Sequence, residues 1–203
     1  MEAQDIQQIK KTISEVWDWI SIIEDEATLN AAVGLYFNQV LFSGAFGRVA
    51  VLDGKVVGVV FASAGNDGPG YRALLEDGTK HAATLLGARE ADRENIREYF
   101  TKIHQAYEQL ISGLEENYDG TLDFLVLAKE SQGHGIGKLL WQAAQVYFVE
   151  KGARAVYLYS DTECNYNFYE GQGFKRKREM ETVFVFEGEP FETKQFLYEY
   201  RFD

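Results

Sequence analysis

The stretch from residue 122 to residue 141, LDFLVLAKESQGHGIGKLLW, constrains the fold more than any other part of the chain. It begins with the nearly continuous apolar run Leu122–Leu127, which is typical of a buried strand. It continues through Gly133, Gly135 and Gly137 into a segment with a helical pattern. Such a strand, turn and helix need a sheet on which the helix can pack. We therefore expect an α/β (mixed α+β) fold with a central mixed sheet flanked by helices.

The rest of the chain predicts both helices and antiparallel strands. Two β-branched runs within residues 48–63 flank Asp53-Gly54, a dipeptide that favours the positive φ angles of a tight hairpin turn. The periodicity predicts these further elements: a helix with Ile6, Ile9, Ile13, Val16, Trp17 and Ile20 on one face, a helix from Leu29 to Leu41, a helix over 91–114 with Ile96, Phe100, Ile103, Tyr107, Leu110 and Leu114 on one stripe, a helix over 135–151, a strand over 155–160, a short helix over 165–170, and a closing antiparallel pair at 181–186 and 194–202. We expect one domain over residues 1–203, with residues 71–119 as a helical insertion before the central strand.

The charge balance limits the partners. Lys and Arg number 20 and Asp and Glu number 32, which gives a net charge of −12. This acidity repels phosphate backbones and anionic lipids, so we expect neither nucleic acid nor membrane as a partner, and a cationic small molecule is favoured. The single cysteine, Cys164, cannot form an internal disulfide, and no Cys/His cluster predicts a metal site. Because no apolar run reaches the ~20 residues of a membrane span and the first residues lack a signal-peptide core, a cytoplasmic location is expected.

The glycine-rich turn predicts an anion site. Glycines allow close backbone approach, and the free N–H groups at a helix start face negative charge, so phosphate or pyrophosphate is the expected ligand. A P-loop is excluded because Gly137-Lys138 is followed by Leu139 rather than Ser or Thr. The G-x-G-x-G spacing argues against a dinucleotide fingerprint, although the position of Asp161 alone does not exclude one. A plain connection with spare glycines is the structural alternative.

Two motifs together resemble one family. Residues 132–137, QGHGIG, resemble the Q/R-x-x-G-x-G/A motif of the GNAT superfamily of acyl-coenzyme A-dependent N-acyltransferases, and residues 165–174, NYNFYEGQGF, resemble its F-Y-x-x-x-G-F motif. The resemblance is strong over 122–203 and looser over 48–63. It implies an N-acetyltransferase that moves acetyl from acetyl-coenzyme A to a primary amine by direct attack in a ternary complex. It also implies that 71–119 is inserted between the family's third and fourth strands.

The resemblance assigns the cofactor site. The backbone amides that would bind the coenzyme A pyrophosphate belong to Gln132, Gly133, His134, Gly135, Ile136, Gly137 and Lys138. The acyl and pantetheine part would lie along Leu125, Val126 and Leu127, at a splayed gap between this strand and the next. A main-chain N–H near Val126 or Leu127 would polarise the acyl carbonyl. The first two helices, together with the insertion, would frame the amine pocket.

The second motif supplies the expected acid. Tyr169 matches the family tyrosine that protonates the departing thiolate, although a tyrosine here is also an ordinary core aromatic. Thr162 stands where many members have a cofactor-contacting Asn. Asn165, one helical turn before Tyr169, is expected to take over that contact or to orient Tyr169, and an N-cap role is an equal alternative. Cys164 is interpreted as a buried filler rather than a nucleophile.

The sequence offers several candidates for the general base. Asp123 is the first candidate because a strand residue can face the cleft, and Glu130 and Glu26 are alternatives; each is also readable as a solvated carboxylate. The histidines are expected at the surface or in packing roles: His81, His104 and His134. The basic run 175–178 is interpreted as a solvated strand edge, with steering of the anionic cofactor as an alternative. A non-catalytic acyl-coenzyme A-binding or partner-binding domain is the competing function, and the aromatic C-terminal strands could pair in a homodimer.

Overall fold

A six-stranded sheet forms the centre of the computed structural model, which describes residues 1–17, 22–65, 67–68 and 70–202. The strand order is β1-β2-β3-β4-β6-β5, and all neighbours are antiparallel except β3 and β4. The strands are β1 (Phe46–Leu52), β2 (Lys55–Ala64), β3 (Gly120–Leu127), β4 (Ala155–Asp161), β5 (Lys175–Phe186) and β6 (Glu189–Arg201). The helices are α1 (Ile6–Val16), α2 (Glu26–Ser43), α3 (Gly78–Leu86), α4 (Glu90–Ile111), α5 (Ile136–Glu150) and α6 (Tyr166–Gly171). The expected mixed sheet flanked by helices is confirmed.

The hairpin turn and the crossover helix lie where the sequence predicted them. Asp53 and Gly54 have φ angles of 50° and 76°, as the tight hairpin turn requires. The parallel pair β3 and β4 is joined by α5, the crossover helix that a parallel connection needs. Ile20, expected on the inner face of the first helix, lies outside the described residues.

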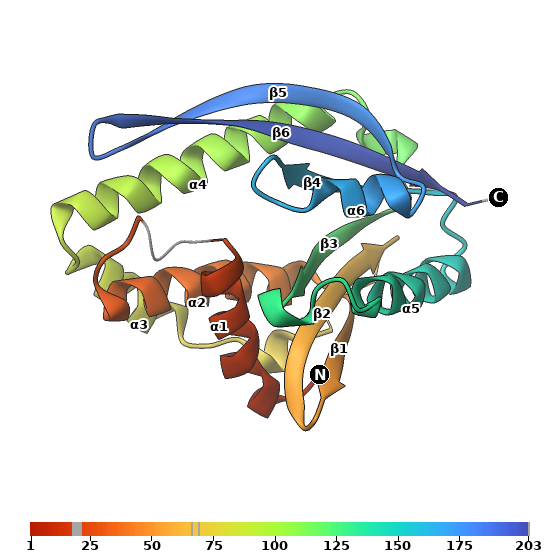
Figure 1. Cartoon of the computed structure of the whole chain (residues 1–203), viewed down its shortest axis with the longest axis horizontal. Helices are drawn as coiled ribbons and strands as arrows, with labels where there is room; N and C mark the ends of the chain where they lie inside the picture. The colour runs from red at the N-terminus through yellow and green to blue at the C-terminus, as the bar shows by residue number, and fades with distance from the viewer. Residues whose placement is uncertain (18–21, 66, 69, 203) are drawn as a thin grey trace.

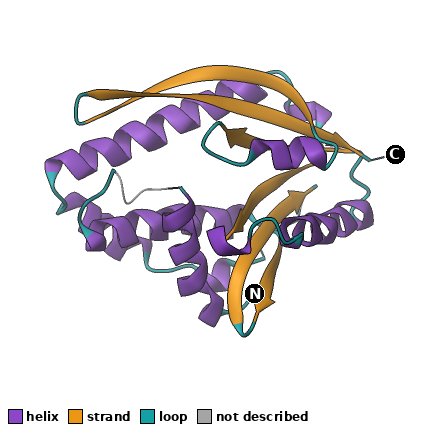
Figure 2. Ribbon diagram, viewed as in Figure 1, coloured by secondary structure: helices purple, strands orange, loops and turns teal. Residues whose placement is uncertain are grey.

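Each face of the sheet carries its own core, and helices cover both faces (Figures 1 and 2). One core packs α5 on the sheet, and its largest fully buried side chains are Trp141, Phe148, Leu158, Phe196 and Tyr198. The other core packs α1 and α2 and includes Ile9, Ile13, Phe37, Leu41 and Phe61. The predicted apolar face of the first helix is therefore a true core face. No helix in the described ranges has both the length and the hydropathy needed to cross a bilayer.

The segment 71–119 is helical, as expected. It lies between β2 and β3, directly before the strand that leads into the glycine-rich loop. Its second half forms α4, close to the helix predicted over 91–114, whereas α3 was not predicted. In Figure 1, α4 runs along the β5–β6 hairpin at the top of the view.

The closing hairpin is longer than the sequence indicated. The strands were expected at 181–186 and 194–202, but β5 already begins at Lys175 and β6 at Glu189. The basic run therefore lies on the edge strand, as interpreted, yet three of its members have defined partners: Arg176, Lys177 and Arg178. Arg176 lies 4.0 Å from the ring centroid of Phe196 and pairs with Glu170 at 2.8 Å. In this hairpin β6 is an interior strand of the sheet and β5 is its edge.

Candidate active site

Strands β3 and β4 separate soon after they meet. Their parallel pairing covers two residue pairs, Gly120 with Val156 and Thr121 with Tyr157. Beyond this point β3 stays paired with β2 up to Leu127, and β4 stays paired with β6 up to Asp161. A gap therefore opens between the carboxyl ends of β3 and β4, the place where open α/β sheets bind ligands.

The backbone of β3 presents donors to this gap. The N–H of Ala128 donates to the carbonyl of Val57 at 2.9 Å, on the β2 side. Because successive N–H groups of a strand point to opposite sides, those of Leu125 and Leu127 point away from β2, toward the gap. Of the two positions considered from sequence, Leu127 rather than Val126 therefore offers its N–H to a ligand.

A β-bulge in β3 places Asp123. Phe61 pairs with Phe124, but the next pair is Ser63 with Thr121, so β3 carries one extra residue at this point. The Asp123 carboxylate accepts the Ser63 hydroxyl at an Oγ–Oδ2 distance of 2.5 Å, and the same Oγ lies 2.9 Å from the carbonyl of Ser43. Asp123 is thereby fixed beside the end of α2 and lines the cavity described below.

The surroundings of Asp123 make its carboxyl a weaker acid than an exposed aspartic acid. Burial raises the pKa of this carboxyl to about 6, and the hydrogen bond from Ser63 opposes the rise. The Ser63 hydroxyl has a single proton for two acceptors, Asp123 and the Ser43 carbonyl. A protonated Asp123 would donate to Ser63 and free that proton for Ser43, which satisfies all three groups. The two alternative bases, Glu130 and Glu26, are exposed and do not line the cavity.

The glycine-rich loop leaves a row of amides without protein acceptors. Gly133 and Gly135 have φ angles of 78° and 79°, and Gly135 is the residue that caps the start of α5. Within the described part of the chain, the N–H groups of residues 133–138 donate to no backbone or side-chain acceptor. We call these six N–H groups the amide cradle. Since they combine with the positive end of α5, they form a site for a phosphate or pyrophosphate group.

Gly137 joins the loop to the neighbouring elements. A Cβ at this buried position would lie 3.0 Å from Leu127 Cδ1 and 3.2 Å from Phe168 Cε2. The absence of a side chain therefore lets the first turn of α5 approach both β3 and α6. The two sequence motifs thus meet in space at Gly137.

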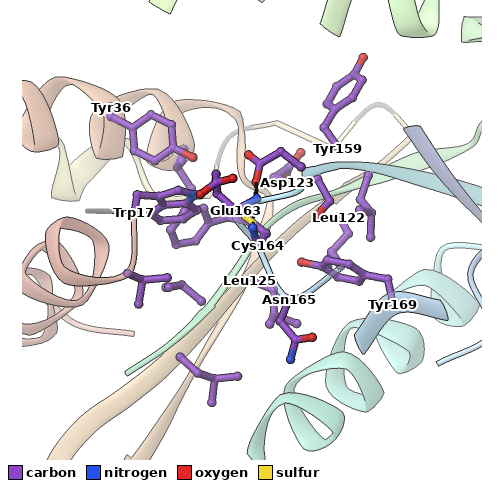
Figure 3. Close-up of a pocket in the computed structure, with 18 of the residues that line it drawn as sticks. Trp17, Tyr36, Leu122, Asp123, Leu125, Tyr159, Glu163, Cys164, Asn165 and Tyr169 are labelled. Carbon is purple, nitrogen blue, oxygen red and sulfur yellow. Dashed lines mark hydrogen bonds between the residues drawn. The ribbon is translucent and has the colours of Figure 1, made fainter. Parts of the chain in front are cut away.

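Tyr169 reaches the cavity from α6. Its ring packs against Phe168, Phe174 and Tyr198, and in Figure 3 its hydroxyl points toward the middle of the pocket. Burial raises the pKa of the Tyr169 phenol above its ordinary value, with a smaller rise from Cys164. The phenol therefore stays protonated at neutral pH and can act as a donor.

The neighbours of Tyr169 differ from what the motif suggested. Asn165 holds the N-cap position of α6 but makes no capping bond, and in Figure 3 its amide extends away from the Tyr169 hydroxyl, so an orienting role has no support. Thr162 bonds the Thr193 hydroxyl at 2.7 Å and is thereby held by β6. Burial raises the pKa of the Cys164 thiol, which fits a filler better than a nucleophile.

One cavity of about 1400 Å³ joins these parts. The expected site residues that line it are Asp123, Leu125, Val126, Leu127, Gln132, Gly133, Gly135, Gly137, Lys138, Asn165 and Tyr169. His134 and Ile136 do not line it, and His134 is exposed, as its position in the loop predicted. Among the described residues, no cluster of His, Cys, Asp and Glu suits a metal ion.

Comparison with known proteins identifies the family. The model of the acetyltransferase (GNAT) family matches residues 13–174. The chain belongs to the GNAT acetyltransferase family. No curated protein sequence matches the chain.

Solved structures agree on the GNAT fold. PH1933 from Pyrococcus horikoshii OT3 aligns with a TM-score of 0.60 and 14% identity, covering 100% of this chain and 94% of that one. Ribosomal-protein-alanine N-acetyltransferase from Brucella melitensis gives 0.55 and 12%, covering 100% and 97%. PaiA N-acetyltransferase from Thermoplasma acidophilum, solved with coenzyme A, gives 0.51 and 15%, covering 100% and 96%. At these identities the comparisons establish the fold.

Sequence reasoning missed the aromatic wall of this GNAT site. The rings of Tyr107 on α4 and Tyr159 on β4 stack with centroids 4.0 Å apart and planes 4° apart, and both residues line the cavity. Tyr36 on α2 and Phe100 on α4 line it as well. The periodicity of α4 predicted an apolar stripe that packs against the core. Ile96 and Phe100 of this stripe do pack against the core, and both also line the cavity. Of the other histidines, His81 lies outside the cavity lining and pairs with Glu76 at 2.9 Å, whereas His104 is an exposed lining residue that pairs with Glu108 at 3.0 Å.

Proposed function

We propose that the chain is an N-acetyltransferase that moves acetyl from acetyl-coenzyme A to a primary amine, by direct attack while both substrates are bound. The observation that carries this proposal is that the amide cradle, Asp123 and Tyr169 open into one cavity beside the gap between β3 and β4. A phosphate-bearing donor, a base and an acid are the groups that acyl transfer to an amine requires.

The residues present fit coenzyme A as the carrier of the acyl group. The amide cradle can take up its pyrophosphate without any cationic cluster, so the net charge of −12 is no obstacle. Lys138 and Lys129 border the same cavity and add positive charge at the loop. When bound, acetyl-coenzyme A supplies the thioester from which acetyl is transferred.

Asp123 is the base in this scheme. An amine reaches the site as an ammonium ion and must lose a proton before it can attack. With a pKa of about 6, the Asp123 carboxyl is mostly ionised at pH 7 and still basic enough to accept that proton. No Lys, Arg or His side chain in the described ranges forms an ion pair with Asp123, so the carboxylate remains available to the ammonium.

Leu127 and Tyr169 assist the acyl group from opposite sides of the gap. The N–H of Leu127, directed away from β2, donates to the thioester carbonyl oxygen as negative charge develops there. The hydroxyl of Tyr169 donates its proton to the departing thiolate. Asn165, which lines the cavity at the start of α6, contacts the cofactor rather than Tyr169.

A thiol-release assay with Tyr169→Phe tests the scheme. Acetyl-coenzyme A should raise the melting temperature of the wild-type protein, and free thiol should appear when an accepted amine is added. Tyr169→Phe should lower kcat by about 10²-fold, the usual worth of one positioned acid, and leave the calorimetric Kd for coenzyme A unchanged. Tyr200→Phe, outside the cavity lining, is the matched control.

The competing function is a domain that binds acyl-coenzyme A without catalysis. Thermal stabilisation by acetyl-coenzyme A with no thiol release on any amine would favour that function. Unchanged turnover in Tyr169→Phe would remove Tyr169 from the acid role.

A further inference from the structure

Helix α4 forms one wall of the cavity. Its pocket face carries Ile96, Tyr99, Phe100, Ile103, His104 and Tyr107. Its anchors run along its whole length: Asn95 Nδ2 to the Ile22 carbonyl at 2.9 Å, the Val185 N–H to Glu98 Oε1 at 3.0 Å, and Arg178 Nη1 to the Leu110 and Ser112 carbonyls at 3.0 and 2.8 Å. These contacts near both ends of α4 fix the helix as one wall of the cavity, which is partly open to solvent.

The wall that this helix completes is mainly apolar and aromatic, and its polar side chains are uncharged amides and hydroxyls together with one histidine: Gln39, Ser43, Tyr36, Tyr99, Tyr107 and His104. The residues that α1, α2, α3 and α4 contribute to the cavity lining include no Asp or Glu among those described. Leu35, Leu85, Ile96, Phe100 and Ile103 supply aliphatic and aromatic surface, and the Tyr107–Tyr159 stack borders it. Contact between this wall and an apolar body is favourable, whereas placing a charged group against the wall costs free energy.

The carboxylates of the lining come from β3, β4 and the turn after β4. They are Asp123, Asp161 and Glu163. Asp161 is buried, and its Oδ1 accepts the N–H groups of Glu163 and Cys164 at 2.9 Å each, while Glu163 is exposed. Asp123 is therefore the carboxylate in the cavity that has both the seclusion and the free acceptor capacity to hold one cation.

We infer that the acceptor is a small primary monoamine with an apolar alkyl or aromatic body, an inference that rests on the proposed function. The ammonium group faces Asp123, and the body lies against α2 and α4. A second ammonium on the same molecule would meet a wall that has no carboxylate, and a peptide would bring a row of polar backbone groups against a mainly apolar surface.

A matched set of amines tests this inference with acetyl-coenzyme A as donor. Hexylamine and 1,6-diaminohexane have the same length and differ by one charge, 2-phenylethylamine adds a ring, and a hexapeptide with an N-terminal alanine represents a protein terminus. We expect kcat/KM for both monoamines to exceed that for the diamine and the peptide by at least about tenfold. A diamine or peptide used as well as hexylamine would overturn the inference.

Two variants of α4 add a test of the wall itself. Ile103→Glu places a carboxylate on the pocket face and should shift the ratio of diamine to monoamine kcat/KM by about tenfold toward the diamine. Gln105→Glu makes a matched change to an exposed side chain of the same helix that does not line the cavity, and should leave the ratio unchanged. Equal ratios in the two variants would contradict the proposed position of the amine body.

Direct binding separates this inference from the proposed function. Hexylamine and 1,6-diaminohexane are titrated calorimetrically into wild-type protein saturated with coenzyme A. If the monoamine binds more tightly in this titration but no thiol is released in the separate assay with acetyl-coenzyme A, acetyl transfer is refuted and the pocket chemistry is supported. If thiol is released in that assay but the diamine binds more tightly, acetyl transfer is supported and the monoamine class is refuted.

Discussion

Asp123→Asn should make the protein more stable while removing its activity. The substitution keeps the shape of the side chain, removes the charge, and supplies an amide that can donate to Ser63 Oγ. The Ser63 proton is then free for the carbonyl of Ser43, 2.9 Å away. The variant therefore relieves the burial of a charge without leaving a neighbouring polar group unsatisfied.

The expected gain follows from the pKa of Asp123. Its rise from 3.8 to about 6 corresponds to roughly 2 units, and at 1.36 kcal/mol per unit the charged carboxylate lowers the free energy of unfolding by about 3 kcal/mol. Because the side chain is half-buried, solvent screening brings this to about 2–3 kcal/mol. The penalty is nearly complete above about pH 7, fades as the pH falls through 6, and is lost below about pH 3, where the carboxyl is protonated in both the folded and the unfolded state.

Urea denaturation followed by tryptophan fluorescence measures this difference. At pH 8 the variant should gain about 2–3 kcal/mol, and at pH 5 about half of that. Glu130→Gln, which removes a charge from an exposed side chain, should change stability by less than about 0.5 kcal/mol at either pH. A variant that is no more stable than wild type at pH 8, or a gain that is equal at both pH values, would refute the argument.

The remaining predictions concern activity and two structural contacts. Wild-type kcat/KM should fall about tenfold per pH unit below pH 6 as Asp123 becomes protonated, and a profile that is flat down to pH 5 would count against this base. Gly135→Ala should lower the free energy of unfolding by about 1–2 kcal/mol because φ at this position is +79°. The same variant should weaken coenzyme A binding in calorimetry. Gly171→Ala, at an ordinary helical φ, should change neither stability nor binding. Arg178→Gln loses two carbonyl contacts at the end of α4 and should lower the free energy of unfolding by about 1–3 kcal/mol in thermal melts, against less than about 0.5 kcal/mol for Lys175→Gln.

The sequence predicted elements whose signals are local. Asp53-Gly54 fixed a turn, and the apolar periods of α1, α4 and α5 were readable from a few consecutive residues. The short α3 was missed because none of its nine residues is fully buried and only Leu85 packs against the core, which is too little to give an apolar period. The first residues of β5 were missed because a run of basic side chains has no strand pattern of its own, and pairing with β6 holds them extended.

The surroundings of the candidate base, Asp123, also could not be predicted from local sequence. Asp123 was selected because it lies on the strand before the loop, but the strand pattern gave no sign of the bulge that turns it. Its hydrogen-bond partner Ser63 is 60 residues away in the chain. The raised pKa of this carboxyl is a property of the packed state, so no window of sequence contains it.

By itself, the sequence determined the amide cradle and the position of Tyr169, because positive-φ glycines and a helix start act through the residues that contain them. Only the tertiary structure decided how the cavity is walled. The stripe on α4 reads as core in any periodicity analysis, and α4 borders the site because Arg178 and Glu98 fasten it to β5. Which apolar face meets a core and which meets a ligand depends on contacts between segments far apart in the chain, and these exist only after folding.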